Sequence, residues 1–317
     1  MALSKKNTKL SIIAPCYNEE SNITIFYKRI IKVIKKLKIN SYQIIFVDDG
    51  SKDNTWLKIN EIYIKDKKRV VGLKLSKNFG HQSAILSSLD YCLGDYILFI
   101  DVDLQDPPEL LEKMYKLINS KKANVVYCQR NTRTEGLFKK LSAKIFYKIF
   151  NLFSYTKIPN EVSDFRLIDK KVLEVLKNFK EQDPFIRGVV SWSGFKQEKI
   201  IFDRNKRHLG KSGWTFRKMF NFSLNAFFGF SNYPMRFSFF ISLILIIIFV
   251  ILGIRAMITY LNGENIQGWT SLFMIIILFN IFNFFILGLI SEYTGRIYLE
   301  VKNRPRFIVE KKLDKLI

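Results

Sequence analysis

The sequence predicts an α/β fold with a mainly parallel β-sheet, followed by two membrane-spanning helices. Three observations support this prediction. Over residues 1–130, short apolar runs alternate with helix-like stretches, as in repeated β-α-β units. Polar clusters follow several of these runs, at the strand ends where parallel sheets bind their ligands. Two long runs without any charge then occupy most of residues 237–290.

The expected strands are short runs rich in Ile, Val, Leu and Phe. They cover residues 10–15, 43–47, 69–75, 96–101 and 124–128. The expected helices lie between them, at about residues 21–38, 53–66, 80–92 and 108–120. Because strands that alternate with helices of this length join through crossovers, the pattern predicts β-α-β units and parallel pairing.

The two uncharged runs predict transmembrane helices. Residues 237–254 and 269–290 are about 18 and 22 residues long, enough for each to cross the hydrocarbon core as a helix. Basic residues flank the pair on both outer sides, whereas the connection, residues 255–268, carries one Arg and one Glu. By the positive-inside rule, both chain termini and the large N-terminal domain are expected in the cytoplasm.

The chain is thus expected to have four parts. These are an α/β domain (1–210), an amphipathic segment (211–235), two transmembrane helices (236–291, at about 237–258 and 269–290) and a cytoplasmic tail (292–317). In the amphipathic segment, aromatic and cationic residues alternate at helical spacing, which favours a helix lying among lipid headgroups. An ordinary packed helix is the alternative.

The composition limits the choice of compartment and partner. A net charge of +23 suggests a polyanionic partner such as nucleic acid, anionic lipid or a phosphorylated substrate, although lysines on solvated helix faces are an alternative explanation. Since no nucleic-acid-binding motif is present and basic residues gather at the membrane flanks, no nucleic-acid partner is expected. Three dispersed cysteines and an N-terminus without an apolar signal segment fit a reducing, cytoplasmic location.

Acidic residues follow the predicted strand 96–101 in a pattern typical of a metal site. In an extended chain, Asp101, Asp103 and Gln105 would face one point while Val102 and Leu104 face the core. Two carboxylates and an amide oxygen suit Mg²⁺ or Mn²⁺, whose remaining ligands are commonly substrate phosphates. Two carboxylates that only cap a helix are the alternative.

A second acidic turn follows the strand 43–47. The carboxylates of Asp48 and Asp49 could accept hydrogen bonds from a nucleotide base or a ribose hydroxyl. The alternative is a simple capping turn, in which Asp53 is the N-cap of the next helix.

These motifs together resemble the family 2 glycosyltransferases with a GT-A fold. They comprise Pro15-x-Tyr17-Asn18-Glu19, Asp48-Asp49-Gly50-Ser51 and Asp101-x-Asp103-Leu104-Gln105-Asp106-Pro107-Pro108. The similarity is greater to the polyprenyl-phosphate branch, which includes dolichol-phosphate mannose synthase and the bacterial undecaprenyl-phosphate (bactoprenol) glucosyltransferases. It continues through residues 163–167, 185–188, 192–195 and 292–305, and so covers nearly the whole chain.

The resemblance implies roles for particular residues. The nucleotide sugar is expected to contact Pro15, Tyr17, Glu19, Val47, Asp48, Asp49, Asp101, Arg130 and Arg207. The metal ligands are expected to be Asp101, Asp103 and Gln105, with Mg²⁺ or Mn²⁺ bound, and the catalytic residues Asp103 and Asp164. The lipid phosphate is expected to contact Arg166, Arg187, Lys211 and Arg217. Relatives often have a Lys where this chain has Gly213, so Lys211 would have to replace that contact.

The expected reaction transfers one hexose, glucose from UDP-glucose, to undecaprenyl or another polyprenyl phosphate, with inversion. GDP-mannose, UDP-galactose and UDP-N-acetylhexosamines are alternative donors. A processive polysaccharide synthase and a non-enzymatic nucleotide-sugar-binding protein are further alternatives; the sequence lacks the Gln-x-x-Arg-Trp motif of the synthases. Because a phosphate monoester has its second pKa near 6, a general base is not obligatory. Asp164 could therefore take a proton, orient the acceptor or simply form a salt bridge. By resemblance, a homo-oligomer, a tetramer, is expected in the plasma membrane.

Overall fold

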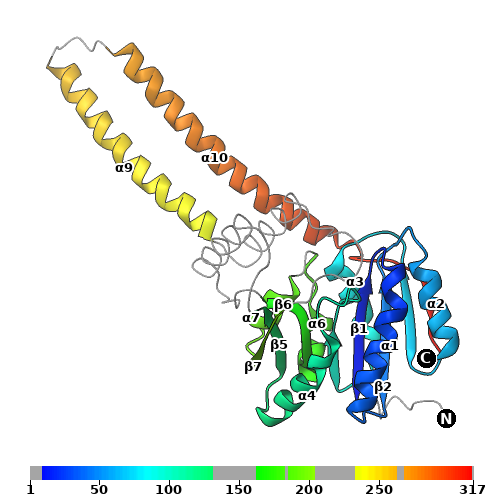
Figure 1. The fold of residues 1–317 in the computed structure, drawn as a ribbon. Helices are drawn as coiled ribbons and strands as arrows, with labels where there is room; N and C mark the ends of the chain where they lie inside the picture. The colour runs from blue at the N-terminus through cyan, green and yellow to red at the C-terminus, as the bar shows by residue number, and fades with distance from the viewer. Residues whose placement is uncertain (1–8, 131–161, 183–184, 204–232, 263–267, 316–317) are drawn as a thin grey trace. The chain divides into compact units, whose positions relative to one another are not determined.

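The computed structural model describes residues 9–130, 162–182, 185–203, 233–262 and 268–315 (Figure 1). They belong to two compact units. The first contains the β-sheet and the tail from Pro305 onward, and the second contains the apolar helices, ending at Arg304. The predicted contacts of Arg207, Lys211 and Arg217, and most of the amphipathic segment 211–235, lie outside the described residues.

The first unit begins with four strands that alternate with helices. The strands are β1 (Leu10–Cys16), β2 (Tyr42–Asp48), β3 (Val70–Leu75) and β4 (Tyr96–Phe99). The helices are α1 (Glu20–Lys36), α2 (Thr55–Lys65), α3 (His81–Ser88) and α4 (Leu111–Ser120), with short 3₁₀ turns η1 (Leu89–Tyr91) and η2 (Pro108–Leu110). This alternation confirms the predicted β-α-β pattern.

The described residues in the later part of the first unit add four strands and two helices. The strands are β5 (Val125–Arg130), β6 (Val162–Asp169), β7 (Gln197–Phe202) and β8 (Val309–Leu313). The helices are α6 (Lys170–Asn178) and α7 (Ile186–Trp192). All eight strands form one sheet in the order β7-β5-β6-β4-β1-β2-β3-β8. Pairing is parallel for β1–β2, β2–β3, β1–β4 and β5–β7, which confirms the mainly parallel sheet.

The centre of the sheet is apolar on both faces. Every residue of β1 and β2 is buried, as expected for parallel strands that are covered by helices on both sides. On one side α1 contributes Ile23, Phe26 and Ile30, which are fully buried, and the Phe26 ring packs edge-on against Phe46. Burying each of these side chains stabilises the fold by about 1.5–3 kcal/mol, so the strand ends stand on a rigid base.

Strand β6 runs antiparallel to β4, and this direction positions the candidate site. Its register pairs Phe99 with Arg166, so the beginning of β6 lies beside the end of β4. Ser163 and Asp164, at the start of β6, therefore meet the turn that follows β4. A hydrogen bond from Ser163 Oγ to Asp106 Oδ2, 2.8 Å long and buried, connects the two segments.

The C-terminal tail is part of the sheet, although the sequence predicted only a cytoplasmic extension from residue 292. Strand β8 pairs antiparallel with β3, and Lys74 Nζ lies 3.5 Å from Glu310 Oε2 across this pair. The position of Gly72 shows how closely the two strands pack. A Cβ atom there would lie 3.1 Å from both Ile59 Cγ2 and Leu313 Cδ1, so any larger residue would push against Leu313.

Among its described residues, the second unit has two long helices, α9 (Tyr233–Leu261) and α10 (Trp269–Lys302). Within the described residues, one helix is long and apolar enough to cross a membrane, at Met274–Lys302; a shorter apolar stretch, Leu243–Thr259, lies in α9. Both helices extend beyond the predicted spans of 237–258 and 269–290. Whether both cross a membrane stays a prediction.

Candidate active site

The loops that follow β1 and β2 are joined by hydrogen bonds at the carboxyl ends of these strands. Asn18 N donates to Ser51 Oγ (2.9 Å), and Lys52 N donates back to Asn18 Oδ1 (2.9 Å). Asn18 has a positive φ of 54°, a conformation that Asn tolerates better than most residues. The N-cap position of α2 is Asn54, not Asp53 as predicted. Asp53 instead accepts hydrogen bonds from the N–H and hydroxyl of Thr55.

The nucleotide-binding positions inferred from the resemblance differ in exposure. Tyr17 is 42% exposed and Glu19 is half-buried, so both can meet a ligand at the rim, the end of the sheet where the loops after β1, β2 and β4 lie. Val47 and Asp48 are fully buried. Pro15 is buried within β1, and Arg130 ends β5. Their contacts with a nucleotide stay predictions.

Asp49, directly after β2, binds the backbone of the loop between β3 and α3. Its Oδ1 accepts a hydrogen bond from Phe79 N (2.7 Å) and its Oδ2 accepts one from Gly80 N (3.0 Å). Burial raises the pKa of Asp49 to about 6, although these two N–H groups act in the opposite direction. Asp49 therefore fixes the loop between β3 and α3, a contact that the sequence did not predict.

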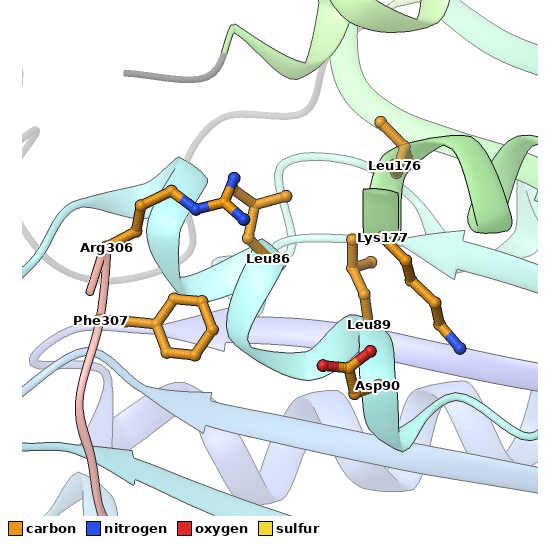
Figure 2. A pocket seen from close by; sticks show the side chains of 7 residues that line it. All are labelled: Leu86, Leu89, Asp90, Leu176, Lys177, Arg306 and Phe307. Carbon is orange, nitrogen blue, oxygen red and sulfur yellow. The ribbon is translucent and has the colours of Figure 1, made fainter. Parts of the chain in front are cut away.

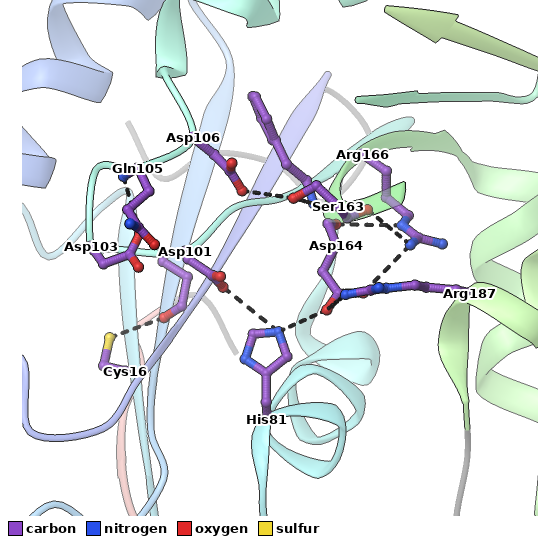
Figure 3. A network of polar contacts seen from close by, with 12 residues as sticks. Cys16, His81, Asp101, Asp103, Gln105, Asp106, Ser163, Asp164, Arg166 and Arg187 are labelled. Atoms are coloured by element: carbon purple, nitrogen blue, oxygen red, sulfur yellow. Dashed lines mark hydrogen bonds and ion pairs between the residues drawn. The ribbon is translucent and has the colours of Figure 1, made fainter. Parts of the chain in front are cut away.

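The metal-site residues lie on a turn. The chain leaves the strand geometry after Phe99, and Leu104 adopts a left-handed φ of 60°. The prediction of an extended chain is thus wrong here, while Val102 and Leu104 are buried in the core as predicted. Figure 3 shows Asp101, Asp103 and Gln105 close together on this turn; Gln105 N donates to Asp103 Oδ1 at 3.1 Å.

The chemistry of the turn fits a divalent cation. The pKa of Asp101 is raised to about 6, chiefly by burial and also by the nearby carboxylates of Asp103 and Asp106, although His81 acts in the opposite direction. A cation bound here would relieve the repulsion among these carboxylates. No group of three His, Cys, Asp or Glu side chains suited to a metal occurs among the described residues. Asp101 and Asp103 supply only two such ligands, so Gln105 and the substrate would have to complete the shell.

A cluster of positively charged side chains surrounds Asp164. Arg187 Nε and Nη2 donate to its two carboxylate oxygens at 2.7 and 2.8 Å, and Arg166 Nη2 lies 3.5 Å from Oδ1 (Figure 3). Although burial alone would raise the pKa of Asp164, Arg187 and His81 hold it well below its usual range. The structure therefore brings together the predicted base and two of the predicted phosphate-binding arginines.

His81 lies between the two clusters. Its Nε2 is 3.6 Å from Asp101 Oδ1 and 3.5 Å from Asp164 Oδ2 (Figure 3). Burial would lower the pKa of His81, but Asp101 and Asp164 outweigh this and raise it to about 9. No sequence motif indicated His81. The only local signal is its place directly after Gly80, where the loop from β3 ends and α3 begins.

A small cavity lies elsewhere, beneath the tail (Figure 2). Its volume is about 40 Å³, room for about one water molecule and far too little for a nucleotide. It is lined by Leu86, Leu89, Asp90, Leu176, Lys177, Arg306 and Phe307. It therefore belongs to the packing of the tail and is separate from the acidic turn.

The mainly parallel sheet, with acidic turns after β2 and β4, defines a GT-A-like α/β protein. The model of glycosyl transferase family 2 matches residues 11–177, more than half of the chain. The protein belongs to this family and is a glycosyltransferase.

Similar proteins match along nearly the full length. The uncharacterized glycosyltransferase YkcC of Bacillus subtilis is 38% identical over 312 residues, which is 96% of this chain and 94% of the relative. The SfII prophage-derived bactoprenol glucosyl transferase of Shigella flexneri is 36% identical, over 96% and 98% of the two chains. The prophage bactoprenol glucosyl transferase homolog of Escherichia coli K12 is 35% identical, over 96% and 99%.

Proposed function

We propose that this glycosyltransferase moves one hexose, glucose from UDP-glucose, to a polyprenyl phosphate at the cytoplasmic face of a membrane. The observation that carries the proposal is the pairing of two clusters of opposite charge at one rim. Three carboxylates gather around the turn after β4, while Arg166, Arg187 and His81 surround the single carboxylate of Asp164. The names of the relatives supply the lipid and the sugar, because bactoprenol is a polyprenol and those proteins are glucosyl transferases.

The acidic cluster suits the donor side. Asp101, Asp103 and Gln105 would hold Mg²⁺ or Mn²⁺, which when bound neutralises charge on the diphosphate leaving group. Tyr17 is exposed and Glu19 is half-buried at the neighbouring loop, where both can meet the nucleoside. The turn is fixed at both ends, by buried Val102 and by the Ser163–Asp106 hydrogen bond, so its carboxylates need little reorganisation to bind.

The basic cluster suits the acceptor side. A phosphate monoester carries nearly two negative charges at neutral pH, and guanidinium groups match its oxygens in geometry and charge. Arg187 is partly exposed, with 20% of its side chain accessible, whereas Arg166 is 3% accessible. Arg187 is thus the residue that can reach the acceptor, and Arg166 supports Asp164 from within the sheet.

The reaction needs no proton acceptor when the acceptor is a dianion. A phosphate oxygen forms the new bond to the anomeric carbon, the bond from that carbon to the diphosphate breaks, and the nucleoside diphosphate leaves from the opposite face. Inversion follows from this single displacement. Since Asp164 has a lowered pKa and a bidentate bond to Arg187, its role is to orient Arg187 rather than to take a proton.

The membrane location and topology are part of the same proposal. Two membrane-crossing helices, α9 and α10, would hold the sheet near its lipid acceptor, with the catalytic domain and both termini in the cytoplasm. Basic flanks and the apolar composition of both helices support this arrangement. The homo-oligomer and the choice of nucleotide base stay predictions.

One experiment tests the proposed function directly. The purified full-length protein is incubated with undecaprenyl phosphate, Mg²⁺ or Mn²⁺, and separately with UDP-glucose, UDP-galactose, UDP-N-acetylglucosamine or GDP-mannose. Mass spectrometry of the lipid should show one added hexose with UDP-glucose, and none with the variant Asp103→Asn. A preference for another donor would correct the sugar. A polymer, or no lipid-linked sugar from any donor, would refute the proposal.

A further inference from the structure

His81 contacts both charged clusters of the site. Asp101 follows β4 and Asp164 lies in β6, so the two carboxylates come from different strands. A single atom, His81 Nε2, lies 3.5–3.6 Å from an oxygen of each. Without a donor between them, two carboxylates held this near the same point would repel each other.

The position of His81 is fixed from two directions. The backbone N–H groups of Phe79 and Gly80 are held by Asp49, and Gly80 has a φ of 96°, which residues with a side chain rarely adopt. On the other side, Gln82 Oε1 accepts a hydrogen bond from Ile186 N (3.2 Å), next to Arg187. The start of α3 is therefore connected both to the end of β2 and to α7.

We propose that His81 is a positioning residue that holds the Asp101 and Asp164 carboxylates at a fixed separation, so that the donor and acceptor sides of the site stay aligned. The inference rests on the proposed function. A carboxylate that binds a metal is oriented by the partner of its other oxygen. His81 Nε2, 3.6 Å from Asp101 Oδ1, would be that partner through an electrostatic contact rather than a hydrogen bond, while its contact with Asp164 at 3.5 Å keeps the Arg187 pair in place.

Three variants of the full-length protein test this role. His81→Leu removes the donor but keeps an apolar side chain of moderate size. His81→Gln places an amide N–H near the position of Nε2 and should restore function. Ser83→Ala changes the same helix away from the two carboxylates and is the matched control. Each is measured for Mn²⁺ binding in the presence of UDP by calorimetry, without acceptor, and for kcat and KM of sugar transfer.

We expect His81→Leu to weaken Mn²⁺ binding about 10- to 100-fold, the range seen when the hydrogen-bond partner of a metal ligand is removed. It should also lower kcat by a similar factor, with a smaller change in the KM for lipid phosphate. His81→Gln should recover binding and kcat to within about five-fold, and Ser83→Ala should match the unchanged protein. The unfolding temperature should be similar in all three variants.

Two results would overturn the inference. One is unchanged Mn²⁺ binding and kcat in His81→Leu. The other is equal damage in His81→Leu and His81→Gln together with a lower unfolding temperature, which would make His81 a residue of the fold only. The outcome is separable from the proposed function: if the unchanged protein transfers no glucose, the binding measurements still decide the role of His81.

Discussion

Replacing Asp164 by Asn distinguishes an orienting carboxylate from a general base. The substitution keeps the shape of the side chain but removes the charge that faces Arg187, Arg166 and His81. Asp164 is 15% exposed and its pair with Arg187 is bidentate. Breaking a buried pair of this kind costs about 3–5 kcal/mol, and the partial exposure places the expected loss at the lower end, about 3 kcal/mol.

This loss can be expressed in two measurable quantities. If all of it disturbs the orientation of Arg187 in the transition state, kcat/KM falls about 100-fold, since each 1.4 kcal/mol is a factor of ten. If it destabilises the domain instead, the unfolding temperature falls by about 6–12 °C, at about 2–4 °C per kcal/mol. Transfer assays with a fixed acceptor and thermal unfolding of the same preparations measure both.

The pH dependence gives the decisive comparison. Because the pKa of Asp164 lies well below its usual range, its stabilising effect is complete above the unfolded-state pKa of about 4 and is lost only in stronger acid. The ratio of wild-type to Asp164→Asn activity should therefore stay constant from pH 6 to pH 8. As a control, Asp169→Asn on the same strand keeps an N-cap for α6 but sets an amide N–H against Asn124 Nδ2 or Val172 N, which both donate to Asp169, and should cost about 1 kcal/mol of stability without changing the transfer rate. Near-normal activity of Asp164→Asn at pH 8 with loss at pH 6 would refute the orienting role and establish a base.

Three further substitutions probe the donor side, the rim and the tail. Asp103→Asn should lower transfer at least about 100-fold and abolish the response to added Mn²⁺, because the turn keeps only one carboxylate ligand; residual metal activation would remove Asp103 from the metal site. Asp49→Asn sets an amide N–H against the N–H of Phe79 or Gly80, which should cost about 2 kcal/mol of stability. The loss should appear as faster amide exchange in the loop between β3 and α3. Unchanged exchange would contradict the role of Asp49. Leu313→Asp should lower the unfolding temperature by several degrees because the side chain of Leu313 packs over Gly72. Lys311 is exposed on the same strand, so Lys311→Asp should have little effect. Equal effects of the two substitutions would contradict the packing of β8.

The sequence predicted the first part of the sheet well because its strands are apolar on both faces. β1 and β2 are largely apolar runs, and the helix between them made their order unambiguous. Strands β6, β7 and β8 were missed. β7 and β8 include exposed positions, and β8 is mostly charged, so neither shows the run of apolar residues that marks a buried strand. Their pairing depends on partners far away in the chain.

The sequence predicted which residues form the candidate site more accurately than how they are arranged. The acidic residues at 101 and 103 were identified, yet they lie on a turn with a left-handed Leu104 rather than on an extended strand. The contact between Arg187 and Asp164 spans 23 positions and two elements, and no local spacing indicates it. His81 gave little signal for the same reason: its neighbours in space come from β4 and β6.

The pairing of β8 with β3 bears on the proposed membrane crossings of this chain. Helices α9 and α10 lie between β7 and β8 in the sequence, and both strands belong to one sheet. A strand can join that sheet only on the same side of the bilayer, so the intervening chain must cross an even number of times. Zero crossings would leave apolar side chains such as Ile247 (59% exposed) and Met274 (65%) of both helices in water, at a large hydrophobic cost. The pairing of β8 and these exposed side chains therefore support the proposal that both α9 and α10 cross a membrane; among the described residues, only α10 contains a sufficiently long apolar span.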